Sequence, residues 1–159
     1  MSRNHSRVAF PLRYIKRYLF ILIVLLSLNC QALAAESYAV FSFNDEFSPL
    51  TVNKARKLYR GKTQLLQGQR IELSDCPATS TERAEFYRYL LNKNLAQMNA
   101  HWASLSFSGK ARPPKVIARS SIDDLIAWMQ EKPNRIGYAP PTSSVPSNAH
   151  VLCVVSSEN

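Results

Sequence analysis

The sequence predicts an α/β fold, in which a layered sheet carries helices on both faces. Segments rich in β-branched and aromatic residues, which favour strands, alternate along the chain with segments whose apolar residues recur every three or four positions, as in helices. A residue suited to capping precedes each helical segment. Short strands that alternate with helices are typical of layered α/β domains.

The first predicted strand is the segment SYAVFSF at 37–43, which alternates in polarity and is rich in aromatic and β-branched residues. A helix follows, because Thr51 is placed to cap its start and Gly61 to end it. The apolar side chains of this helix fall on one stripe. A second short strand is predicted in QRIELSD at 69–75.

The second half of the chain continues this alternation. Thr79 and Glu82 have the spacing of a capping box, which predicts a helix whose Glu82 side chain reaches back to the amide of Thr79. Asn94 and Ser121 are placed to cap two further helices. The remaining strands are predicted in KVIA, RIGY and HVLCVV, at 115–118, 135–138 and 150–155.

Residues 1–34 have the organisation of a secretory signal peptide. Five Lys and Arg residues precede an apolar run at 18–28, and small residues follow as far as Ala34. An uncleaved membrane anchor is the alternative, but a run this short falls below the roughly 20 apolar residues that a spanning helix needs. The sequence therefore predicts a periplasmic protein with a cleaved signal peptide at 1–34, one domain at 35–159, and membrane contact only before cleavage.

The charge of the chain depends on this leader. The formal net charge of the whole sequence is +9, but the leader holds five of the 20 Lys and Arg residues and none of the 11 acids, which leaves +4. The remaining bases are scattered singly and form no stripe or basic helix. This pattern argues against nucleic acid as a partner and allows only a weak general attraction to anions.

Two cysteines, Cys76 and Cys153, remain after the leader. In an exported chain the sequence predicts a disulfide between them, with two free thiols as the alternative. Neither has a second Cys or a His at ligand spacing, so no metal site is expected. No nucleotide loop or catalytic serine motif is present, which predicts a protein without cofactors that is not an enzyme.

Four segments in succession resemble the substrate-binding component of phosphate ABC transporters. They are LTVNKARKLYRGK, DCPATSTERAEFYRYLL, HWASLSFSGKARPP and SIDDLIAWMQEKPNRIGYAP, which together span most of the region from Val40 to Pro140. The resemblance implies the type 2 periplasmic binding fold, in which two α/β lobes close on a ligand. Since two lobes need roughly 250 residues, the resemblance implies a single-lobe version of this fold.

The resemblance also implies a phosphate site at the start of the helix near Thr79, where free backbone N–H groups and the helix dipole favour an anion. Where the family places an arginine and then Ser-Gly-Thr, this chain has Cys76, Ser80, Thr81 and Glu82, and Arg83 follows as in the family. The candidate ligand-binding residues for phosphate or a similar oxyanion are Thr79, Ser80, Thr81 and Arg83.

Two functions follow from this comparison. The first is a non-catalytic binding protein that takes phosphate weakly if at all, because an arginine contact is lost and Glu82 adds a like charge. The second is an interaction or adaptor protein that has lost the ligand and docks on a sensor, a porin or another envelope complex. An open single-lobe surface suits a protein partner better than a small ion.

Overall fold

The computed structural model describes residues 37–118, 121–140 and 145–158. The predicted signal peptide at 1–34 lies outside these residues and stays a prediction. Within the described ranges, no helix is both long enough and apolar enough to span a bilayer.

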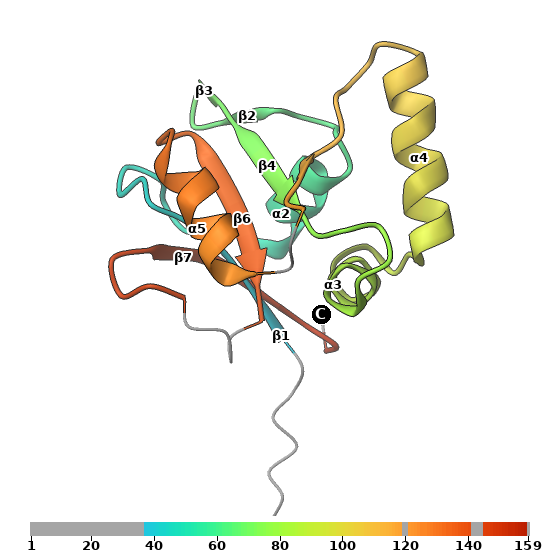
Figure 1. The fold of residues 1–159 in the computed structure, drawn as a ribbon. Helices are drawn as coiled ribbons and strands as arrows, with labels where there is room; N and C mark the ends of the chain where they lie inside the picture. Colours follow the sequence, from blue (N-terminus) through green and yellow to red (C-terminus); the bar gives the residue numbers. More distant parts are fainter. Residues whose placement is uncertain (1–36, 119–120, 141–144, 159) are drawn as a thin grey trace, which may run out of the picture. The chain divides into compact units, whose positions relative to one another are not determined.

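A five-stranded mixed sheet forms the centre of the domain, with the strand order β5-β4-β6-β1-β7 (Figure 1). The strand β4 runs parallel to β5 and β6, whereas β1 runs antiparallel to β6 and β7. A separate two-stranded hairpin pairs β2 with β3. The strands are β1 (Ser37–Ser42), β2 (Leu65–Leu66), β3 (Gln69–Arg70), β4 (Glu72–Asp75), β5 (Lys115–Val116), β6 (Arg135–Ala139) and β7 (His150–Ser156).

Helices cover both faces of this sheet, which confirms the predicted layering. On one face pack α2 (Val52–Tyr59) and α3 (Thr81–Leu91), and α4 (Leu95–Phe107) packs on the outside of α3. On the other face α5 (Ile122–Gln130) buries Leu125 and Met129. The alternation of β1 supplies both cores, because Val40 faces the α2 and α3 side and Phe41 faces α5.

Aromatic packing fixes α3 on the sheet. The ring of Phe86 in α3 stacks on Tyr138 in β6 with 3.6 Å between centroids, and Tyr59 of α2 packs edge-on against Phe86 at 4.8 Å. All three side chains are fully or almost fully buried. Aromatic pairs add roughly 0.5–1.5 kcal/mol beyond the area that they bury, so this cluster holds α3 against β6 and α2.

Helix capping follows the sequence with one correction. Thr51, Asn94 and Ser121 cap α2, α4 and α5 as predicted. The cap of α3, however, is Ser80 and not Thr79, because the backbone of Ser80 is extended and its hydroxyl accepts the N–H of Arg83 at 3.2 Å. The predicted capping box of Thr79 and Glu82 is therefore wrong, because the third helical residue after the Ser80 cap is Arg83 and not a Glu.

Candidate functional site

The first turn of α3 holds the residues that the sequence singled out. Ser80 caps the helix, Thr81 is exposed at its first position, and Thr79 is exposed just before it. Arg83 lies one turn further on, but its side chain is only 5% exposed. The four residues thus lie at the start of α3, but the side chain of Arg83, the one cation among them, is buried.

Arg83 is fully engaged inside the protein. Its Nε donates to Oδ2 of Asp75 at 2.8 Å, and its Nη1 donates to Oδ1 of Asn99 at 2.8 Å. The guanidinium also lies over the ring of Tyr87, 5.3 Å from the centroid. Burial acts to lower the pKa of Arg83, but the hydrogen bond and the charge of Asp75 outweigh it and leave that pKa raised. Arg83 is therefore a permanent internal cation.

Asp75 is the centre of this arrangement. The carboxylate is 3% exposed, at the carboxyl end of β4. Its Oδ1 accepts from the hydroxyl of Tyr138 at 2.7 Å and from the N–H of Cys76 at 2.9 Å. Its Oδ2 accepts from Arg83 and from the hydroxyl of Tyr87 at 2.9 Å. Four donors therefore surround the Asp75 carboxylate. This cradle of donors is of the kind that could bind an oxyanion, but the protein's own carboxylate occupies it.

The two phenols in this cradle stay protonated. Burial raises the pKa of both Tyr87 and Tyr138 well above the ordinary value, and the charge of Asp75 raises each of them further. Both hydroxyls are therefore protonated near neutral pH and donate to Asp75. Asp75 could not be identified from the sequence, because its partners lie on different elements and no local motif links them.

The two cysteines correct the predicted disulfide. Both are free thiols in the structure. Cys76 directly follows β4 and Cys153 lies in β7, and the strands β6 and β1 lie between them. Three strand spacings amount to roughly 14 Å, about twice the Cα separation that a disulfide can span.

The thiol of Cys76 occupies the position that the family resemblance gives to an arginine. Burial is the main reason that the pKa of Cys76 is raised to about 11, and the charges of Asp75 and Glu82 also raise it. The group is therefore neutral near pH 7 and offers no charge to an anion.

A small cavity of about 50 Å³ lies beside this cluster. It is at the carboxyl ends of the parallel strands, between the starts of α3 and α5, where open α/β sheets usually bind ligands. Among the described residues, its lining includes the carboxylates of Asp75 and Glu82 and no Lys or Arg.

Comparison with known proteins gives a fold and no closer relation. No protein-family model matches the chain, and no curated protein matches its sequence. One similar solved structure is a phosphate ABC transporter substrate-binding protein with bound phosphate from Clostridium perfringens, at 16% identity and a TM-score of 0.55 over 75% of this chain. A second is an ABC-type phosphate transport receptor from Vibrio cholerae, at 15% identity and a TM-score of 0.55 over 76% of this chain.

The fold is similar to part of the fold of these two phosphate transport proteins. At these identities the likeness establishes the fold alone. The match covers only 45% of the Clostridium protein and 47% of the Vibrio protein, so this chain corresponds to less than half of each.

Proposed function

We propose that the chain is an exported, non-catalytic binding protein that has kept the fold of phosphate-binding periplasmic proteins and acts by contact with another protein of the envelope. The leader pattern at 1–34 supports export, and the fold supports a binding role without catalysis. On this proposal residues 35–159 form a single lobe of the two-lobed fold. An open lobe surface suits a protein partner.

The ion pair between Asp75 and Arg83 carries this proposal. Arg83 is the cation that would meet an oxyanion at the start of α3, and it is already bound to a buried carboxylate. If phosphate drew Arg83 away, Asp75 would lose its charge partner inside the protein. Removing one member of a buried ion pair costs about 3–5 kcal/mol, which phosphate would have to offset before any net binding.

The surroundings of the pair act in the same direction. Cys76 stands where an arginine would supply charge, and its thiol is neutral. Glu82 borders the small cavity with its own negative charge. A dianion placed there would meet like charge and would find no free cation among the described lining residues, so binding should be weak or absent.

Weak oxyanion binding at Thr79, Ser80 and Thr81 is the second candidate. The observation in its favour is the start of α3, an 11-residue helix whose first backbone N–H groups have no partner within the helix. The hydroxyl of Ser80 already accepts one of these N–H groups, which reduces what remains for a ligand.

Isothermal titration of the purified exported protein with phosphate at low ionic strength tests the proposal, with sulfate as the control anion. We expect no saturable heat up to millimolar phosphate. A Glu82→Gln variant should also stay silent, because removing the repulsion does not free Arg83. Saturable micromolar binding that weakens in Ser80→Ala would overturn the proposal and establish a phosphate receptor.

A further inference from the structure

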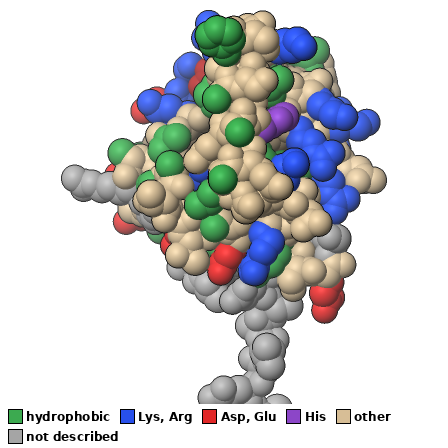
Figure 2. Space-filling model, turned by 90° about the vertical axis from the view of Figure 1, so that its right-hand side faces the viewer, with side chains coloured by type: hydrophobic (Ala, Val, Ile, Leu, Met, Phe, Trp, Pro, Cys, Tyr) green, Lys and Arg blue, Asp and Glu red, His purple; other side chains and the backbone are tan. Residues whose placement is uncertain are grey.

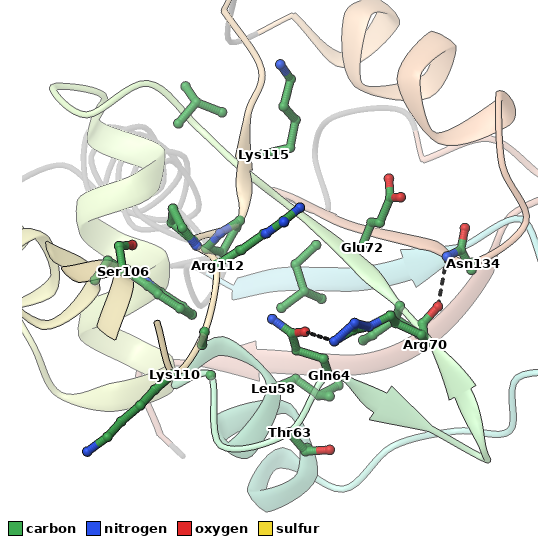
Figure 3. A pocket seen from close by; sticks show the side chains of 18 of the residues that line it. Leu58, Thr63, Gln64, Arg70, Glu72, Ser106, Lys110, Arg112, Lys115 and Asn134 are labelled. Atoms are coloured by element: carbon green, nitrogen blue, oxygen red, sulfur yellow. Dashed lines mark hydrogen bonds between the residues drawn. The ribbon is translucent and has the colours of Figure 1, made fainter. Parts of the chain in front are cut away.

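A second and much larger cavity, of about 1060 Å³, opens at the β5 edge of the sheet (Figure 3). It lies between the ends of α2 and α4, the strand β4 and the segment 109–116 that leads into β5. Its lining includes Glu72 and Leu73 at the start of β4 but not Asp75 at its end. The cavity is thus separate from the start of α3, and its volume slightly exceeds the roughly 300–1,000 Å³ that is typical of ligand pockets.

Four basic side chains line this cavity: Arg70, Lys110, Arg112 and Lys115. In Figure 3 the guanidinium groups of Arg70 and Arg112 extend towards the middle of the cavity from opposite sides. The ammonium groups of Lys110 and Lys115 lie nearer its periphery. The two arginines come from segments 42 residues apart in the sequence, so the fold alone brings them together.

These cations are not neutralised by the protein. The one acid in the lining, Glu72, accepts from Nζ of Lys132 at 2.8 Å and from Nε of Arg135 at 3.0 Å. The guanidinium of Arg70 donates to the neutral amide of Gln64, at 2.9 Å. Among the described residues, none of the four lining cations forms an ion pair.

The surface of the domain also carries a group of basic side chains. On the face that carries α4, Lys and Arg side chains gather at the right of Figure 2 with no acidic side chain among them. A concave site lined by one sign of charge focuses the field and attracts ligands of the opposite sign. The ligand of this cavity should therefore be anionic.

The lining also offers groups that a small anion would not use. The indole of Trp102 lines the cavity, is 6% exposed, and its N–H has no hydrogen-bond partner among the described residues. Apolar side chains of Ile71 and Leu73 form part of the wall. Phe107, next to the lining residue Ser106, is 97% exposed. A ligand with both apolar and acidic groups would contact more of this lining than phosphate could.

The strand β5 gives the cavity an open edge. It is the end strand of the sheet, and Val116, which lines the cavity, is 48% exposed. The N–H of Ile117 donates to the carbonyl oxygen of Asp75 at 2.9 Å, so the neighbouring N–H of Val116 points to the unpaired side. An unpaired strand edge can receive an extended peptide through main-chain hydrogen bonds.

We infer that this cavity binds an acidic, partly apolar segment of a partner protein, which lies extended along β5 with its carboxylates against Arg70 and Arg112. This inference rests on the proposed function and supplies its docking face and the chemistry of the partner. The arginines suit carboxylates because the planar guanidinium matches them with paired hydrogen bonds. The open edge and apolar wall select a peptide over a free anion.

The probe is a fluorescein-labelled octapeptide of alternating Glu and Val, measured by anisotropy against the purified exported protein. We expect saturable binding that weakens as salt is added. Arg70→Glu with Arg112→Glu should weaken it by about tenfold or more. The matched control is Lys54→Glu with Lys93→Glu, which makes the same change in charge outside the cavity and should change the affinity by less than about twofold.

Three further probes identify the kind of ligand. A Lys and Val octapeptide should not bind, and an octapeptide of Glu and Val N-methylated at alternate residues should bind about fivefold more weakly or worse, because it cannot pair with the edge. Tripolyphosphate and phosphatidylglycerol vesicles should bind more weakly than the acidic peptide.

Several outcomes would overturn the inference. One is that the acidic peptide does not bind below millimolar concentration. Another is that the control variant loses as much affinity as the Arg70→Glu and Arg112→Glu variant. The others are that the N-methylated peptide binds as tightly as the unmodified one, or that tripolyphosphate or vesicles bind more tightly than the peptide. The phosphate titration is independent of this test. If phosphate and the acidic peptide both fail to bind, only this inference is lost, whereas phosphate binding that depends on Ser80 contradicts the proposed function itself.

Discussion

Nε of Arg83 and Oδ2 of Asp75 lie 2.8 Å apart, and the two side chains are only 6% and 3% exposed. The residues are eight positions apart, and they meet because β4 ends at Asp75 while α3 starts just after Ser80. The cation at the helix start that resembles a phosphate site is thus already paired with the buried carboxylate of Asp75. Whether the pair is a fixed part of the fold can be measured.

Arg83→Met should destabilise the protein by about 3–5 kcal/mol, because it leaves the Asp75 carboxylate buried without its charge partner. Denaturant unfolding followed by circular dichroism measures this loss. Lys54→Met, at a partly exposed position in the first turn of α2, is the control and should change stability by less than about 0.5 kcal/mol.

The double variant Asp75→Asn with Arg83→Met should lose less free energy of unfolding than the sum of the losses in the two single variants. The neutral amide no longer needs a counter-charge, so the two losses overlap. Strict additivity of the two changes would show that the residues do not act as a pair.

The position of the α3 cap gives a second prediction. Ser80→Ala should destabilise the protein by about 1 kcal/mol, because the hydroxyl that accepts the Arg83 N–H is lost. Thr79→Ala should have almost no effect, since Thr79 is exposed and lies outside the helix. Thermal unfolding of the two variants side by side separates them, and a larger loss in Thr79→Ala would restore the capping box expected from the sequence.

The thiols give a third prediction. With a pKa raised to about 11, Cys76 is almost entirely protonated at pH 8, and burial also raises the pKa of Cys153. Iodoacetamide should therefore modify the native protein slowly, with the Cys76 rate rising as pH approaches 11. After denaturation without reductant, mass spectrometry should find two carbamidomethyl groups on the chain from which residues 1–34 have been removed.

Rapid loss of one thiol at pH 8 would contradict the raised pKa of Cys76. An unalkylated chain whose mass is two daltons below that of the reduced chain would mean that the two thiols form a disulfide. Cys153→Ser is the control, because it leaves Cys76 as the single thiol of that cleaved chain and assigns the rate to it.

Local patterns predicted most of the elements. The strands β1, β6 and β7 and the helices α2, α4 and α5 appear where alternation, apolar stripes and capping residues placed them. The strand predicted at 69–75 divides into β3 and β4 in the structure. The strand β2 that pairs with β3 was missed, because the turn residues Gln67 and Gly68 both adopt positive φ, at 50° and 83°, without the usual Asn-Gly signal.

The site depends on contacts that local patterns do not encode. Asp75 gathers donors from α3 and β6, and the large cavity joins Arg70 to Arg112 across the β5 edge. The predicted disulfide failed for the same reason, since the order of strands in the sheet separates Cys76 from Cys153. The order of strands is set by long-range pairing, which single-residue patterns leave open.

The pH dependence of stability gives the last prediction, through Glu72. The hydrogen bond from Lys132, and to a smaller extent the one from Arg135, lowers the pKa of Glu72 below its ordinary value of 4.5. The unfolded chain therefore binds a proton at a higher pH than the folded protein does, so this contribution is complete above pH 4.5 and is lost as pH falls below it. Thermal unfolding between pH 7 and pH 3 should show wild type more stable than Glu72→Gln at pH 7, with the difference shrinking towards pH 3. Since Glu72 is 40% exposed, the difference should also shrink in high salt, and a gap that stays constant with pH would exclude this ion pair as its cause.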